Sequence, residues 1–209
     1  MALTRSTTGA QSILEAALAL FSDVGFDGAS IADIAEKAGV CKANVFHHFA
    51  SKEELYAAVI RSATAAHADY AEELFRAPGS SADKVRRLVD FEIHHMLAHR
   101  QRTRLLLRET SDGNHVRGRR LARTVFQRNF TAMVNIFEQG RERGEFHPSM
   151  DPAAAAMLLC GAAQCFFNYR ESLREYREAS GLETPEAYSA RVAALILTGV
   201  VRREGVQSG

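Results

Sequence analysis

The stretch from residue 30 to residue 52 gathers side chains that can bond to nucleic acid. Lysine ammonium groups donate to phosphate oxygens, and asparagine and histidine side chains can also bond to the edges of bases. Free amides at the start of a helix add a further position that binds phosphate. We therefore expect a DNA-contacting surface here, which comprises Ser30, Cys41, Lys42, Asn44, His47, His48 and Lys52.

Two short helices joined by a tight turn would position these groups. Apolar residues recur at helical spacing over residues 31–38, and Ser30 precedes them as an N-cap. Gly39 can adopt the left-handed conformation that ends a helix, and a second helix is predicted from residue 41 or 42 to about Phe49. This is the pattern of a helix-turn-helix, whose second helix enters the major groove of DNA.

The side chains of the second helix divide into packing and contacting groups. Val45 can fill the space between the two helices, and we expect Phe46 and Phe49 to anchor the second helix to its neighbours. The side chains expected to face outward, toward bases or phosphates, are those of Lys42, Asn44 and His47.

Three runs in this region, IADIAEKAGV, VFHHF and SKEEL, resemble the signature of the TetR (tetracycline-repressor-like) transcriptional regulators. The resemblance is strong over about the first 55 residues and rests on helix pattern beyond them. It implies a DNA-binding module, a ligand-binding domain and a linking helix that starts at Ser51. Phe46 stands where the family usually has a tyrosine that touches phosphate, so that role is not transferred to it. Cys41 stands where the family usually has a serine, at the start of the second helix of the helix-turn-helix.

Length and composition agree with an all-α protein of two parts. The 209 residues include 46% apolar and 24% charged residues, four prolines and no tryptophan, with a net charge of +1. We expect a helix-turn-helix DNA-binding domain over residues 1–55 and a ligand-binding and dimerisation domain over residues 56–209. The first residues lack the apolar core of a signal peptide, and the three cysteines have no metal or redox spacing, so a cytoplasmic protein is expected.

The remaining helices follow from apolar periodicity and from breaks at glycine and proline. The third helix is predicted to begin at Ser51, whose spacing to Glu54 is that of a capping box. Helices are predicted at about residues 8–21, 51–75, 83–99, 103–110, 152–170 and 185–201, with loops at 23–28, 111–114 and 144–152. A further long helix is predicted to follow the loop at 111–114 and to end at about residue 140.

The last two predicted helices are apolar on more than one side, so they need partners beyond a single domain core. The resemblance implies that they pair with the same helices of a second subunit in a four-helix bundle. A two-fold homodimer would present two reading helices to a palindromic operator in double-stranded DNA. Burial of both helices within one monomer is the alternative.

A small-molecule effector site is implied mainly by the resemblance. Such a site is apolar with a few polar groups, and the effector would be lipophilic. Gln164 and Asn168 lie four residues apart in an apolar helix and would share one face. The candidate residues are Phe91, His95, Leu106, Phe126, Phe130, Met133, Phe137, Gln164, Phe167 and Asn168; an ordinary core is the alternative for each aromatic one.

Charge is unevenly distributed. Residues 1–52 contain four basic and five acidic side chains, so DNA binding there must depend on local placement and amide donors. Residues 100–128 contain nine arginines and two acids, a net charge of +7, which could steer DNA, hold an anionic ligand or form a solvated face. The arginines are Arg100, Arg102, Arg104, Arg108, Arg117, Arg119, Arg120, Arg123 and Arg128.

The residues also relate to four other function classes. A thiol at a helix start, as Cys41 would be, allows a redox-responsive regulator, and the spacing of His95 and His99 allows a metal-responsive one. We expect neither a metal site nor a cofactor, because histidines are common on amphipathic helices. A DNA-bound protein that acts through a protein partner stays open. An enzyme is not expected, since the chain has no nucleophile elbow, phosphate loop or metal-ligand spacing.

Overall fold

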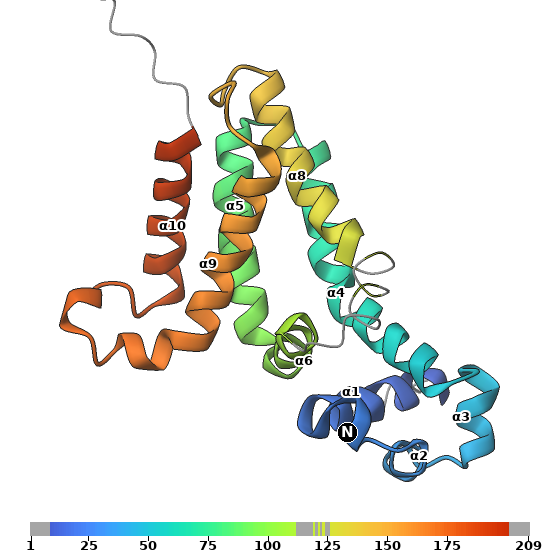
Figure 1. Ribbon diagram of the computed structural model, residues 1–209. Coiled ribbons are helices and arrows are strands. Elements are labelled where there is room, and N and C mark those ends of the chain that lie inside the picture. The colour runs from blue at the N-terminus through green and yellow to red at the C-terminus, as the bar shows by residue number, and fades with distance from the viewer. Residues whose placement is uncertain (1–8, 112–118, 120, 122, 124–125, 201–209) are drawn as a thin grey trace, which may run out of the picture. The chain divides into compact units, whose positions relative to one another are not determined.

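The computed structural model describes residues 9–111, 119, 121, 123 and 126–200. Across these residues the regular structure is helical and contains no β-strand, which confirms the all-α prediction. Figure 1 labels the α-helices, and a 3₁₀ turn at Arg177–Ala179 precedes the last of them. The α-helices are α1 Gly9–Gly28, α2 Ile31–Ala38, α3 Lys42–His48, α4 Lys52–Arg76, α5 Ser81–Ala98, α6 Arg100–Ser111, α8 Gln127–Glu142, α9 Pro152–Leu173 and α10 Pro185–Val200.

The chain forms two compact units. The first consists of Met1–Ala65 and His99–Val125, and the second consists of Ala66–Ala98 and Phe126–Gly209. Helix α4 contributes residues to both units, because the division falls within it.

In the first unit, α1 packs against α2, α3 and α6. Its core is fully buried and apolar, and Tyr56 from α4 meets an aromatic pair from α1. The Tyr56 hydroxyl also donates a buried hydrogen bond of 2.6 Å to Glu109 Oε2, which ties α4 to α6 within this unit. The fully buried core residues are Ile13, Ala17, Phe21, Ile34, Val45, Leu55, Ile60 and Leu105.

The loop predicted at residues 23–28 is wrong, because α1 stays helical to Gly28 apart from a break at Gly25. Gly25 has φ 79° and ψ 178°, a left-handed conformation that glycine adopts without steric cost, so the chain kinks and then resumes the helix. A Cβ atom at this position would lie 3.2 Å from Arg108 Cζ on α6. The glycine therefore serves both the kink and the close approach of α6.

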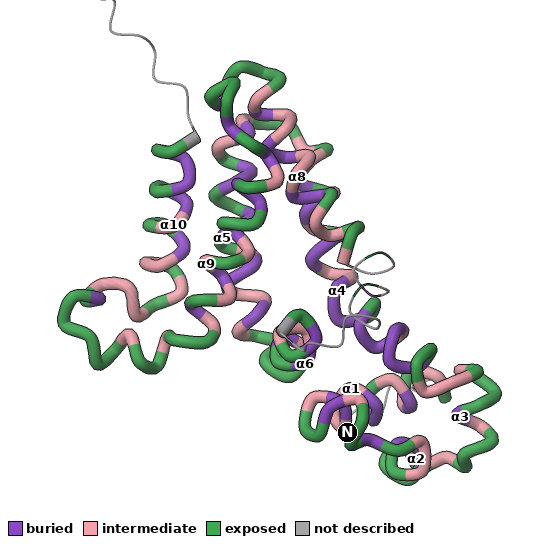
Figure 2. Tube along the Cα trace, in the orientation of Figure 1, coloured by how far each residue is buried: buried purple, intermediate pink, exposed green. Residues whose placement is uncertain are grey.

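In the second unit, α5 packs against α8, α9 and α10, and α9 also contacts α8 and α10. Figure 2 shows buried residues along the inward sides of these helices. On α9 the buried positions recur at helical spacing and are mostly small, which allows neighbouring helices to approach closely. They are Ala155, Ala156, Leu159, Ala163 and Phe166.

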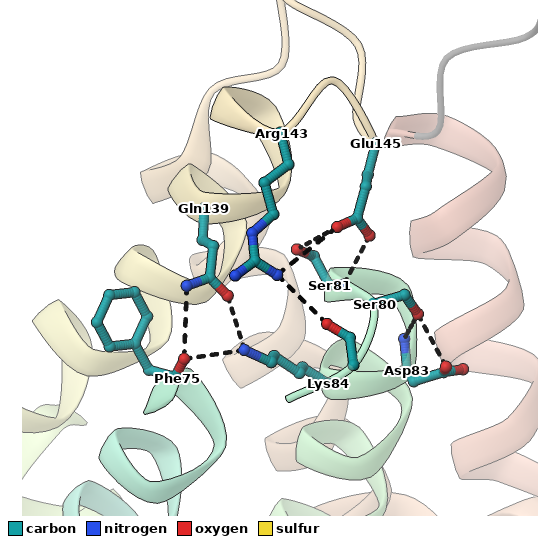
Figure 3. A network of polar contacts seen from close by, with 9 residues as sticks. Phe75, Ser80, Ser81, Asp83, Lys84, Gln139, Arg143 and Glu145 are labelled. Atoms are coloured by element: carbon teal, nitrogen blue, oxygen red, sulfur yellow. Dashed lines mark hydrogen bonds and ion pairs between the residues drawn. The ribbon is translucent and has the colours of Figure 1, made fainter. Parts of the chain in front are cut away.

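A polar network fixes three helix ends in the second unit (Figure 3). The Lys84 ammonium, only 1% exposed as a residue, donates to the Phe75 carbonyl oxygen at 2.9 Å and to Gln139 Oε1 at 2.7 Å. Glu145 accepts from the Ser81 amide at 2.6 Å. The network therefore joins the end of α4, the start of α5 and the end of α8.

The other predicted helices are present, with ends that differ by a few residues. The helix predicted at 103–110 begins earlier, at Arg100, and the helix predicted at 152–170 runs on to Leu173. The predicted loop at 111–114 lies outside the described residues beyond Ser111, which is helical, and residue 201 also lies outside them. Over the described part of the chain, no helix has both the length and the apolar character needed to span a membrane.

Candidate nucleic-acid interface and effector site

Helix α2 has the predicted caps at both ends. Ser30 is the N-cap in an extended conformation, and its Oγ accepts from the Asp33 amide at 3.1 Å while Asp33 Oδ2 accepts from the Ser30 amide at 3.3 Å. At the other end Gly39 has φ 69°, and the Gly39 amide bonds to the Glu36 carbonyl oxygen. These caps set the turn that leads directly into α3.

Helix α3 presents most of its side chains to solvent. Val45 is fully buried, as expected, whereas Lys42, His47 and His48 are exposed. Cys41 is the exposed N-cap residue, and its side chain makes no capping hydrogen bond. The structure thus brings the exposed candidates together on one short helix.

Two predictions for α3 are wrong. Phe46 was expected to pack, but it is 51% exposed, because Val45 takes the inward position and the next residue points about 100° away around the helix. Asn44 was expected to face outward, but it is half-buried, and its Oδ1 is enclosed without a hydrogen-bond partner among the described residues. A Cβ atom on Gly9 of α1 would lie 3.7 Å from that oxygen.

The start of α4 holds the last candidate of the DNA-contacting set. Ser51 Oγ accepts from the Glu54 amide at 3.1 Å, and Glu54 Oε2 accepts from the Ala50 amide at 2.9 Å, one residue earlier than in a standard capping box. The Lys52 ammonium lies 4.5 Å from the centre of the Phe26 ring. Lys52 is therefore held near the amides that begin α4.

The arginine-rich segment divides between the two units. Arg100, Arg104 and Arg108 are exposed on α6, in the same unit as α2 and α3. Arg128 belongs to the second unit, where its guanidinium donates to Asp69 Oδ1 and to Glu72 Oε1, both at 2.8 Å. Of the others, Arg119 and Arg123 are exposed, Arg102 is half-buried, and Arg117 and Arg120 lie outside the described residues.

The effector-site candidates do not form a single group. Leu106 lies in the first unit, whereas the other nine lie in the second. Gln164 and Asn168 lie four residues apart in α9, as predicted, and Gln164 is half-buried whereas Asn168 is exposed. Met133 and Phe137 are fully buried in α8, and the Phe137 ring lies 6.2 Å from that of Phe146, as in an ordinary core. The half-buried candidates are Phe91, His95, Leu106, Phe126, Phe130, Gln164 and Phe167.

A buried polar cluster lies beside two of these candidates and was missed from the sequence. His67 Nδ1 lies 2.7 Å from Glu92 Oε2, and both side chains are 8% exposed. The His67 ring centre is 4.5 Å from that of His95 and 6.0 Å from that of Phe91. Glu92 occupies a position on the apolar stripe of α5, and a carboxylate at such a position is the signal that could have revealed it.

Cys160 on α9 lies on another side of this cluster. Its thiol donates to Met133 Sδ at 3.5 Å. Burial raises the pKa of Cys160 to about 12, and the negative charge of Glu92 adds to that rise. The thiol is therefore neutral at physiological pH and an unreactive part of the helix packing. Among the described residues, no group of three or more histidine, cysteine or acidic side chains could hold a metal ion.

Comparisons with known proteins agree with this arrangement. Residues 13–59 match the family model of the bacterial regulatory proteins of the tetR family, and residues 82–196 match that of the tetracyclin repressor-like C-terminal domain. The A-factor receptor protein of Streptomyces griseus is 30% identical over 156 residues, which are 71% of this chain and half of that protein. The regulator RutR of Escherichia coli K12 is 53% identical over 51 residues, 24% of each chain.

Solved structures show the same fold over nearly the whole chain. The fatty acid degradation regulator FadR from Bacillus halodurans has a TM-score of 0.76 at 18% identity, covering 94% of this chain and 98% of its own. FadR from Bacillus subtilis in complex with stearoyl-CoA has a TM-score of 0.75 at 16% identity, covering 90% and 97%.

Proposed function

Because the chain belongs to the TetR family of bacterial regulatory proteins, we propose that it is a ligand-responsive, DNA-binding transcriptional repressor. The observation that supports this most directly is the capped α2–turn–α3 unit, whose second helix exposes Lys42, His47 and His48. In this proposal residues 1–55 are the DNA-binding domain, residues 56–209 bind the effector and dimerise, and the protein acts in the cytoplasm.

We assign the DNA contacts to two groups of donors. Lys42, His47 and His48 would meet the major groove and its flanking phosphates, while Lys52 and the amides at the start of α4 would hold a phosphate. Phe46, exposed at the centre of α3, has no donor, so its ring would contribute only apolar contact, for example with a thymine methyl group.

Exposed apolar side chains on the last two long helices support a homodimer. Met157 and Leu158 on α9 are 59% and 61% exposed, and Leu195 on α10 is 74% exposed. Large apolar side chains so exposed on neighbouring helices are typical of an interface. A dimer formed through two such faces, related by a two-fold axis, would present two copies of α3 to the two halves of a palindromic operator.

The regulatory step would pass through α4. One end of this helix packs in the first unit through Leu55 and Tyr56, and the other holds His67 and Leu74 in the second. A lipophilic effector that binds the second unit in one conformation would select a spacing of the two α3 helices that does not fit the operator. The stearoyl-CoA complex of FadR from Bacillus subtilis, a relative in fold, supports a lipophilic ligand.

Selection of genomic fragments bound by the purified protein, followed by footprinting, tests this function. We expect one or a few palindromic sites near promoters. Lys42→Ala should weaken their binding, whereas Lys37→Ala, an exposed change on α2, should alter it little. Sites dispersed over the chromosome would favour a partner-recruiting protein, and the absence of specific DNA would refute the proposal.

The dimer has its own test. Leu195→Glu places a charge on the exposed apolar face of α10, so we expect a monomer by light scattering and loss of cooperative operator binding. Val24→Glu, at a 50% exposed position on α1, is the matched control and should leave the dimer intact. A Leu195→Glu protein that remains dimeric would place the interface elsewhere.

A further inference from the structure

One oxygen of a buried carboxylate in the second unit has no hydrogen-bond donor. Glu92 is 6% exposed; its Oε2 is paired with His67 at 2.7 Å, while Oε1 is enclosed without a partner among the described residues. An ionised carboxylate can only accept, so opposite an ionised Glu92 the His67 Nδ1–H is the donor to Oε2. Buried polar atoms are nearly always bonded, and an unpaired carboxylate oxygen is costly, so Oε1 is a position for a donor that the described residues do not supply.

The surroundings of this carboxylate are aromatic. The His95 ring lies 4.5 Å from His67 and 5.0 Å from Phe91, and Phe91 stacks on Tyr70 at 4.0 Å. Tyr70, Phe91 and His95 are half-buried, so a bound molecule can reach them without unfolding the unit. The faces of aromatic rings attract cations, and most strongly where water is excluded.

Within the part of the chain that the structure describes, the partner of Glu92 is the imidazole of His67, and no lysine or arginine reaches the carboxylate. The neighbouring Cys160 thiol is neutral and bonded to Met133. The negative charge is therefore available to a ligand, and an anionic head group, which the arginines of the sequence suggested, would meet it with like charge.

We propose that Glu92 Oε1 accepts a hydrogen bond from the protonated amine of a lipophilic effector, whose cationic head lies against the rings of Phe91 and His95. The regulatory consequence rests on the proposed function, because only a DNA-bound repressor can be released by such a ligand. Binding of the amine itself does not depend on it. This assignment narrows the effector from any lipophilic molecule to a lipophilic amine.

Three probes that share a twelve-carbon chain separate the possible head groups. Isothermal titration calorimetry of the full-length protein with dodecylamine, dodecanol and dodecanoate, each at a concentration where it is dissolved as monomers, should give the amine the highest affinity and the carboxylate the lowest. A hydrogen bond to a charged group is worth roughly a 10- to 100-fold change in affinity, and this is the expected margin of dodecylamine over dodecanoate. Equal affinities, or no binding of dodecylamine, would overturn the proposal and leave Oε1 to a buried water.

Matched variants test the contact itself. Glu92→Gln keeps the shape of the side chain and removes its charge, so dodecylamine should bind roughly 10- to 100-fold more weakly while dodecanol changes little. Glu142→Gln removes an exposed carboxylate of the same unit and should change neither. Phe91→Leu, a second variant with an apolar replacement, should lower the affinity for dodecylamine several-fold more than the affinity for dodecanol. An amine affinity unchanged in both Glu92→Gln and Phe91→Leu would refute the site.

Operator binding separates this inference from the proposed function. We expect dodecylamine to release the selected operator from the wild type but not from Glu92→Gln, and both proteins to bind it equally without amine. If amine binds and no operator is found, the proposed function fails and the amine site stands. If the protein binds the operator but does not bind the amine, the amine site fails and the proposed function stands.

Discussion

Replacing Lys84 with methionine tests whether the network in Figure 3 fixes the helix ends of the second unit. Methionine matches the length and apolar stem of lysine but cannot donate a hydrogen bond. The change therefore removes the bonds from Nζ to the Phe75 carbonyl oxygen and to Gln139 Oε1, at 2.9 and 2.7 Å, with little change in packing volume.

The expected loss follows from the two bonds and from the cost of burying the ammonium. A hydrogen bond from a charged group contributes about 1.5–3 kcal/mol, which gives about 3–6 kcal/mol for the two. Burial, and then the nearby Arg143, lower the pKa of Lys84, so the wild type also bears a desolvation cost that methionine removes. We therefore expect a net loss of about 2–4 kcal/mol in the free energy of unfolding.

Urea unfolding of the full-length protein, followed by circular dichroism, measures this loss. With a slope of about 2 kcal/mol/M, the midpoint should fall by about 1–2 M. Arg87→Met, which removes an exposed charge from the same helix, is the control and should shift it little. In a double-mutant cycle, Gln139→Leu should cost less in the Lys84→Met background than in the wild type. A Lys84→Met protein as stable as the wild type would refute the reasoning.

Three further predictions concern single positions. Gly140→Ala places a Cβ atom 2.3 Å from the Phe146 ring, and this overpacking should lower the free energy of unfolding by about 1–3 kcal/mol. An unchanged midpoint of urea unfolding would contradict the close packing of Gly140 on Phe146. The pKa of His94 is raised by its bond to the Asp90 carbonyl oxygen and by nearby carboxylates, so its contribution is present at low pH and lost as pH rises through that pKa. His94→Ala should therefore destabilise the protein more at pH 5.5 than at pH 8.5. The difference should be at most about 0.5 kcal/mol, because the side chain is partly exposed. Equal losses of stability at the two pH values would contradict the raised pKa of His94. Phe46→Tyr restores a hydroxyl on the exposed face of α3 and should strengthen operator binding several-fold in a gel-shift titration, and weaker binding would show that the ring contacts an apolar group.

The helices were predictable because their signals are local. Caps such as Ser30 and Gly39, and apolar residues at helical spacing, depend on neighbours within one or two turns of the chain. The continuation of α1 past residue 21 was missed because residues 23–28, which include Gly25, were interpreted as a loop. Its partner in that kink, Arg108, lies 83 positions later in the chain, which no local pattern reveals.

The interior of the second unit was predictable only in part. Phe91 and His95 were identified as candidates, but the His67–Glu92 pair beside them was not. Charged residues on an amphipathic helix usually belong to its solvated face, and the partner lies 25 residues away on a different helix. The stripe of buried positions on α5 passes through Lys84, Leu88 and Glu92 at four-residue intervals, so two of its members are charged.

The buried side chains of Lys84 and Glu92 lie on one face of α5, but we infer different roles for them because their hydrogen bonding differs. Lys84 has two good acceptors within the unit, as expected of a group that fixes structure. Among the described residues Glu92 has a hydrogen-bond partner on one oxygen only, as expected of a group whose second partner is a ligand. The two variants should therefore separate stability from binding. Lys84→Met should lower the urea midpoint and leave dodecylamine affinity nearly unchanged under folding conditions, whereas Glu92→Gln should weaken the amine and change the midpoint little. Loss of both properties in both variants would mean that α5 is one structural element in which neither charge has a separate role.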